Sequence, residues 1–160
     1  MEKSQFSIRG NVKLYSLPSE FTYDDFKKLD DKEKYLIDEG DNLVVDAGMI
    51  RVANLMTGTS TVSWTLCGVG SGTNTPVSTD TALQTSIGTN TINDRYRAGL
   101  NAYFNTFFGK SDDNGTWTET CLLTSDSVML CRRLFSAAFT KDTSKAAVVA
   151  WTITLSAVAD

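Results

Sequence analysis

The sequence predicts a mainly β protein, an antiparallel β-sandwich-like domain with one amphipathic helix and a short charged helical segment near the N-terminus. Thr, Ser, Val and aromatic residues crowd the chain after Thr57, and these residue types favour strands over helices. Tight turns separate about five to seven strand-like runs, as in an all-β domain. A chain of 160 residues fits one domain and is long enough to bury a core.

The first 42 residues are expected to form an N-terminal strand and a charged arm, and residues 43–160 the β-rich core of what is a single domain overall. Residues 11–15 form the first predicted strand, which ends at Pro18 because proline cannot donate to a ladder. In the charged stretch that follows, Thr22 is placed to cap a short helix with Phe26 and Leu29 on one face. A second short turn is expected around residues 35–37.

The spacing of apolar residues predicts a helix over about residues 42–57. A stripe of four residues at intervals of four, three and four defines its buried face: Val45, Met49, Val52 and Met56. Asp41 or Asn42 is a suitable N-cap and Gly58 a suitable stop. Gly48 costs about 1 kcal/mol relative to alanine inside a helix. Its presence predicts that a strand backbone packs closely against the helix there.

A half-buried strand is predicted from Val62 to Cys67, where apolar and polar residues alternate, and it ends in the glycine-rich loop 68–72. This loop does not match a phosphate-binding motif, because it lacks the G-K-[ST] ending and Thr73 stands where G-x-G-x-x-G needs glycine. It predicts instead a backbone with positive φ or a close approach at the strand end. A helical turn is expected from Asp80 to Ile87.

The second half of the chain predicts four more strands, over residues 100–108, 116–123, 128–139 and 147–155. Asn114-Gly115 predicts a hairpin between the first two of these. The last strand places five apolar side chains on one face: Ala147, Val149, Trp151, Ile153 and Leu155.

Charge and composition exclude several classes of protein. The net charge is −4 and no block of Lys and Arg stands out, so no nucleic-acid partner is expected. No apolar run reaches the length of a membrane span, and the first residues do not resemble a signal peptide. A soluble protein made and kept in the cytoplasm, or assembled there, is expected.

The sequence offers little for a metal site. The chain contains no histidine, which excludes imidazole-ligated metals and triad hydrolases. Cys67, Cys121 and Cys131 form no C-x-x-C pair and are interpreted as small apolar residues buried in strands. Residues 112–115 resemble a calcium-loop fragment, but Lys110 stands where the first ligand would be. The pairs Asp24-Asp25 and Asp30-Asp31 are interpreted as a solvated helix face. No metal or cofactor is expected.

No enzyme is expected either. Asp94 and Glu119 could form an acid/base pair, but nothing in their spacing brings them together. Four arginines could bind anions, although interface or cross-strand ion pairs are the favoured interpretation: Arg95, Arg97, Arg132 and Arg133. No catalytic, cofactor-binding or metal-binding residue is therefore assigned.

From about residue 43 to residue 156, beginning with the predicted helix, the chain resembles a group of small tailed-bacteriophage virion proteins. The resemblance lies in a strand ending Cys67-Gly68-Val69-Gly70-Ser71-Gly72-Thr73, then Pro76, then the turn Asp80-Thr81-Ala82-Leu83. Residues 119–155 add a hairpin, a strand with a basic residue near Arg132 and a Lys-Thr-Ser-like turn at 141–144. The chain departs from that group at residues 119–123, where a glycine and an aromatic residue of the usual E-x-G-L-F-like segment are absent.

The resemblance implies a non-enzymatic structural protein of the virion, assembled in the host cytoplasm. Such proteins decorate the capsid, form head fibres or belong to the tail, and their partners are the major capsid protein or tail subunits. Capsid decoration by a homo-oligomer is the favoured interpretation, with a tail, baseplate or fibre-adaptor component as the alternative. A host-glycan binding module is a third possibility, for which Tyr96, Tyr103 or Trp117 would serve if exposed.

Overall fold

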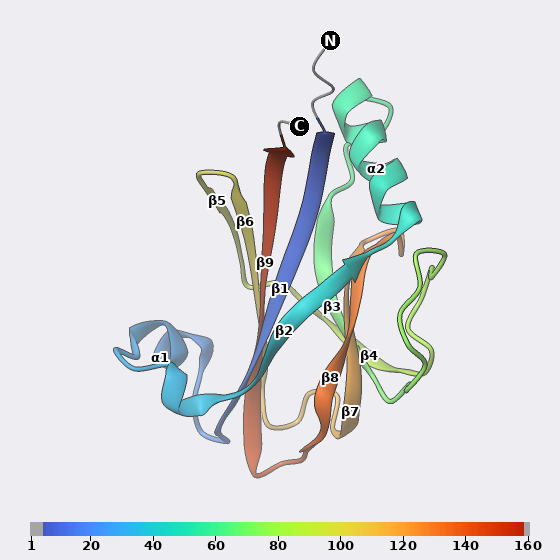
Figure 1. Cartoon of the computed structure of the whole chain (residues 1–160). Coiled ribbons are helices and arrows are strands. Elements are labelled where there is room, and N and C mark those ends of the chain that lie inside the picture. Colours follow the sequence, from blue (N-terminus) through green and yellow to red (C-terminus); the bar gives the residue numbers. More distant parts are fainter. Residues whose placement is uncertain (1–4, 159–160) are drawn as a thin grey trace.

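The computed structural model describes residues 5–158 and shows a mainly β fold, with 56% strand and 14% helical residues (Figure 1). This confirms the predicted class, although nine strands exceed the five to seven expected. The strands are β1 (Gln5–Pro18), β2 (Leu36–Val44), β3 (Trp64–Gly70), β4 (Ser86–Thr91), β5 (Asp94–Ala98), β6 (Asn101–Phe108), β7 (Gly115–Thr124), β8 (Met129–Lys141) and β9 (Lys145–Val158). The helices are α1 (Tyr23–Lys28), α2 (Asp46–Thr57) and the short 3-10 helix η1 (Glu33–Tyr35).

All nine strands belong to one curled antiparallel sheet, in the order β4-β3-β7-β8-β2-β1-β9-β6-β5. A sandwich of two separate sheets is therefore not confirmed. The two strands at the ends of this order, β4 and β5, follow one another in the chain with only Ile92 and Asn93 between them. The curl thus brings the two ends of the sheet to the same place, and the β4–β5 segment crosses behind the central strands in Figure 1.

Side chains join the two ends of the sheet at this crossing. The Ile92 N–H still donates to Thr65 of β3, whereas the Asn93 N–H donates to Asn105 of β6. Asn90 Nδ2 donates to the Phe107 carbonyl (3.2 Å), and the Phe107 N–H donates to Asn93 Oδ1 (2.8 Å). The asparagine amides take the place of a regular ladder between β4 and β6.

The first 42 residues supply two central strands of the sheet. β1 pairs with β9 over its whole length, from Gln5 to Pro18, and with β2 on its other side. β2 was not predicted, and it lies where the sequence suggested a charged arm, a short turn and the start of a helix. The predicted boundary between residues 42 and 43 falls inside β2.

Helix α1 has the predicted start. Thr22 is its N-cap and forms a capping box with Asp25, in which each side chain accepts from the other residue's backbone N–H. The Phe26 ring is buried against the outer face of β1 and β9, in a cluster with Tyr15, Leu17 and Val148. This cluster fixes α1 on the sheet. The 3-10 helix η1 then leads into β2.

Helix α2 begins four residues later than predicted. Its N-cap is Val45, which makes no side-chain cap and instead donates its N–H to the Leu130 carbonyl of β8. Gly58 ends the helix in the left-handed region (φ 71°), as predicted. Gly48 lies directly on β8, since a Cβ there would be 2.6 Å from the Leu130 carbonyl oxygen. The predicted close approach of a strand backbone is confirmed.

The predicted buried stripe of α2 is only partly right. Val45 is fully buried, but the Met56 side chain is 81% exposed and Met49 is 38% exposed. The buried face of the helix contains Gly48 and Arg51 instead. Gly48 packs against the backbone of β8, and Arg51 forms an ion pair with Asp126 in the turn before β8.

The core fills the inside of the curled sheet. Trp117 and Trp151 are fully buried in it, together with the predicted inner face of β9 up to Ile153.

Two local predictions are wrong. No helical turn forms over residues 80–87, because Asp80 binds Arg132 and β4 starts at Ser86. Asn114-Gly115 is not in a hairpin, because β6 pairs with β5 and β9 whereas β7 pairs with β3 and β8.

Candidate functional site

An apolar groove of about 560 Å³ opens at one end of the curled sheet, between α2 and the strands β1, β3, β6 and β9. In Figure 1 this is the end at which β1 begins and β9 finishes, beside α2. The described residues that line the groove are all apolar: Phe6, Ile8, Val52, Leu55, Met56, Trp64, Ala102 and Leu155.

The groove exists because the inward faces of β1 and β9 continue beyond the part of the sheet that the core fills. Ile153 is 4% exposed, but Leu155, two residues further along the same face, is 38% exposed. Phe6 of β1 is 55% exposed, and Trp64 lies deeper, at 7%. Helix α2 covers this end only in part.

Exposed apolar residues continue onto the rim of the groove. Met56 is 81% exposed, and Leu100, whose carbonyl accepts from the Leu155 N–H, is 66% exposed. Contiguous exposed apolar surface of this kind marks sites where proteins bind other molecules. This groove is the strongest candidate for a functional surface in the described part of the chain.

Glu119 and Arg132 form a buried ion pair under the glycine-rich loop. The Glu119 side chain is 0% exposed and that of Arg132 2%, with 2.7 Å between Arg132 Nη2 and Glu119 Oε2. Glu119 also accepts three backbone N–H groups, from Gly72 (2.9 Å), Gln84 (3.1 Å) and Thr85 (2.8 Å). Every oxygen of this carboxylate is occupied, so it holds the loop and is not placed as a general base.

Arg132 extends the same network to the far side of the loop. Its Nη1 lies 2.8 Å from Asp80 Oδ2, and its Nη2 donates to the Asn74 carbonyl (3.0 Å). Burial alone would raise the pKa of Asp80, but the Val77 N–H and the Arg132 guanidinium outweigh it and lower that pKa. The strand extends beyond the predicted end at Cys67, to Gly70. The predicted close approach at the strand end is confirmed, because a Cβ on Gly70, the last residue of β3, or on Gly72 in the loop after it would collide with Glu119.

The other arginines also hold elements together. Arg133 reaches Asp38 of β2 (2.6 Å), and Arg51 of α2 makes two contacts with Asp126 in the β7–β8 turn. Arg95 donates to the Trp64 carbonyl and Arg97 to the Gly99 carbonyl. The ion pairs expected for Arg132 and Arg133 are confirmed, whereas Arg95 and Arg97 bind backbone carbonyls.

Asp94 and Glu119 have separate partners. The Tyr23 hydroxyl donates to Asp94 Oδ2 (2.7 Å), and burial followed by this hydrogen bond raises the pKa of Tyr23. Glu119 is enclosed by the loop network. The structure therefore does not bring the two carboxylates together as an acid/base pair.

Two of the three aromatic residues proposed for glycan binding lie at the surface. Tyr96 is 53% exposed and stacks on Tyr103, with ring centroids 4.8 Å apart and planes at 15°. A hollow of about 260 Å³ beside them contains polar groups of Asn105 and Thr152. Trp117 is fully buried between Phe108 and Phe139 and can take no part in binding.

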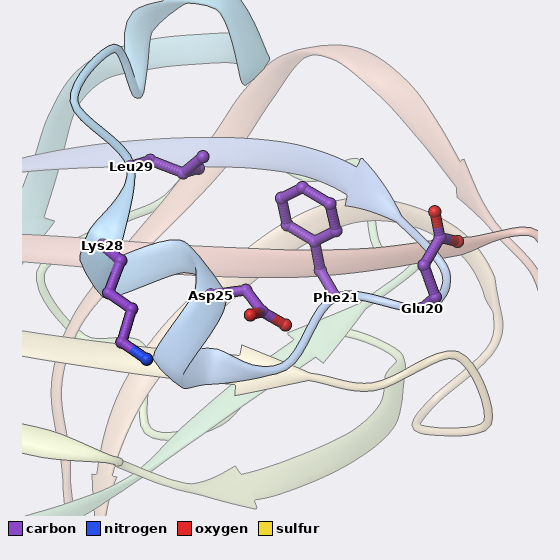
Figure 2. Close-up of a pocket in the computed structure, with 5 residues that line it drawn as sticks. All are labelled: Glu20, Phe21, Asp25, Lys28 and Leu29. Atoms are coloured by element: carbon purple, nitrogen blue, oxygen red, sulfur yellow. The ribbon is translucent and has the colours of Figure 1, made fainter.

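A second hollow of about 390 Å³ lies beside α1, lined by Glu20, Phe21, Asp25, Lys28 and Leu29 (Figure 2). Asp25 is engaged in the capping box, and hydrogen bonds from the Thr22 backbone and side chain lower its pKa. The hollow is open and combines two apolar side chains with charges of both signs. Nothing in it points to a particular ligand.

The three cysteines are buried and unpaired, as predicted. Burial raises the pKa of each thiol, that of Cys67 to about 11, so they are poor nucleophiles and poor metal ligands. Among residues 5–158, no three Cys, Asp or Glu side chains gather in a way that could hold a metal ion.

Comparison with models of protein families, with curated proteins and with solved structures finds no match to this chain. No helix in the described part of the chain has the length and apolar character needed to cross a membrane.

Proposed function

We propose that this protein is a non-enzymatic structural subunit of a bacteriophage virion, which decorates or stabilises the capsid surface as a homo-oligomer. The proposal that the chain forms a homo-oligomer is supported by the apolar groove and its exposed rim at the open end of the sheet. The virion part rests on the resemblance of residues 43–156 to small tailed-phage virion proteins.

A second copy of the chain is the proposed occupant of the groove. The same end carries both a hollow and projecting apolar side chains, Met56 and Leu100, so that two copies related by a twofold axis can each supply both. Among residues 5–158, no ionisable side chain lines the groove. Two copies, each with a net charge of −4, can therefore meet through described residues of the groove that are all uncharged.

The rest of the fold supports a role in presenting surface. The β1–β9 ladder and the buried ion pairs of Arg132 and Arg133 hold the sheet in one shape. A rigid subunit loses little conformational entropy on assembly, which favours repeated modest contacts on a shell.

The alternative, a tail, baseplate or fibre-adaptor component with host-glycan binding, is favoured by one observation. The Tyr96–Tyr103 stack presents an exposed aromatic face beside the polar side chains of Asn105 and Thr152. Sugar rings stack on such faces while polar neighbours bind their hydroxyls. Loss of binding to host surface glycans in Tyr96→Ala, with the oligomer unchanged, would support this alternative.

The test is light scattering on the purified chain, with and without purified capsids, followed by co-sedimentation. A closed oligomer that sediments with heads supports decoration. Met56→Asp should dissociate the oligomer, while Ala53→Asp, exposed on the same helix but outside the groove, should not. A monomer that joins tails favours the alternative, and a monomer that binds neither heads nor tails refutes the virion proposal.

A further inference from the structure

Lys141 at the end of β8 is a buried lysine with an unusual partner. It is 1% exposed, and its Nζ donates to the side-chain oxygen of Asn114 at 2.8 Å. Within residues 5–158 it forms no ion pair with a carboxylate. An ammonium group buried with a single amide acceptor is costly, so burial shifts the protonation equilibrium of Lys141 towards the neutral amine.

The residue before Asn114 carries a carboxyl group in the same turn. Asp113 has a positive φ of 46°, and its Oδ2 is buried without a hydrogen-bond partner. Burial, followed by the nearby Asp112, raises the pKa of Asp113, and burial lowers that of Lys141. Both shifts favour the neutral amine and the protonated carboxyl group.

Aromatic residues cover this end of the sheet. Trp117 Nε1 donates to the Asp113 carbonyl (2.8 Å), and its ring packs edge-on against Phe108 and Phe139. Lys141 follows Phe139 by two residues and is paired with Gly115 across the ladder. Asn114 itself is exposed and can release a small product to solvent.

We propose that Lys141 and Asn114 form an intramolecular isopeptide bond. The neutral Nζ of Lys141 attacks Cγ of Asn114, forming an N–C bond, and the bond from Cγ to Nδ2 breaks. The proton that Nζ loses passes to the departing nitrogen, so that the products are a secondary amide and one ammonia. No oxidant or cofactor is needed.

The bond would tie the end of β8 to the turn before β7, which lie next to each other in the sheet. Such a link stabilises the fold as a disulfide does, by restricting the unfolded chain. The inference does not depend on the proposed virion function.

The test is mass spectrometry of the purified protein and of its proteolytic peptides. The expected result is one branched peptide containing residues 114 and 141, lighter than its parts by one ammonia. Lys141→Met and Asn114→Ala should abolish it. Lys110→Met, at an exposed lysine in the same turn, should leave it unchanged.

Separate, unlinked peptides in the folded protein would overturn the proposal, as would a branched peptide that persists in Asn114→Ala. A mass gain at Asn114 from deamidation, with Lys141 free, would overturn it as well. Because Asn114 is exposed, its alanine variant is expected to fold even if Lys141→Met does not, and circular dichroism checks this.

Discussion

Replacing Glu119 by glutamine tests whether the buried ion pair anchors the glycine-rich loop. Its Oε1 accepts from Gly72 and Thr85, and its Oε2 accepts from Gln84 and Arg132. Glutamine keeps one acceptor oxygen but places an amide donor opposite another donor, and it removes the charge that faces the Arg132 guanidinium.

The expected loss is about 3 kcal/mol of unfolding free energy, at the lower end of the roughly 3–5 kcal/mol for breaking a buried pair. The lower end applies because Asp80 remains 2.8 Å from Arg132 and still compensates its charge. Glu119→Ala should cost more, since it leaves all three backbone N–H groups of the loop without an acceptor.

Denaturant unfolding followed by tryptophan fluorescence measures this loss, and limited proteolysis of residues 71–85 reports whether the loop opens first. The matched control is Glu39→Gln, at an exposed glutamate 3.9 Å from Lys13, which should change stability by less than about 0.5 kcal/mol. If Glu119→Gln costs no more than Glu39→Gln, the buried pair does not anchor the loop.

Three further predictions follow from other contacts. Gly48→Ala should destabilise the protein by about 1–3 kcal/mol despite alanine's better helix propensity, because the new Cβ would lie 2.6 Å from Leu130 O; equal or higher stability in urea unfolding would contradict this. Hydrogen bonds from Arg51 and then Thr124 lower the pKa of Asp126 to about 2, so its stabilisation is full above about pH 4 and lost as pH falls towards 2. Unfolding of wild type and Asp126→Asn should therefore differ at pH 6 and converge near pH 2. Because burial raises the pKa of Cys67 to about 11 and also raises those of the other two thiols, the native protein should resist alkylation at pH 8 and react at three sites in denaturant. Rapid labelling of the folded chain would refute it.

The parts of the fold that the sequence predicted are those with a strong local pattern. β9 alternates apolar with polar residues from Trp151 to Ser156, and α1 has a complete capping box at Thr22 and Asp25. The close approach at Gly48 was predictable because a helix interior rarely tolerates glycine without a packing reason. In each case, a local sequence pattern determined the structure and no tertiary contact overrode it.

The parts that were missed depend on tertiary contacts. β2 contains Asp38, Glu39, Gly40 and Asp41, which favour turns, yet it forms a strand because β1 offers a ladder and Arg133 neutralises Asp38. Asp41 and Asn42 looked like helix caps but lie within this strand, and α2 starts where Val45 binds Leu130 instead.

The sequence predicted that the groove residues are apolar, but it did not predict that they form a groove. Its residues, such as Trp64 and Val52, were recognised as apolar and were expected in the core. Which of them remain accessible depends on how far the sheet curls and where α2 ends. Both follow from long-range pairing that no local pattern encodes.

Side chains complete the curled sheet at the two places where regular strand pairing is shortest. β2 and β8 share only two ladder positions, Leu43 with Arg132 and Val44 with Cys131. Arg133 of β8 extends the contact between these two strands by donating to the Asp38 carboxylate and the Asp41 carbonyl of β2. Between β4 and β6 the amides of Asn90 and Asn93 do the same. Because directed polar groups hold both joints, the curl has one preferred geometry, and the groove at its open end keeps one shape for a partner to fit.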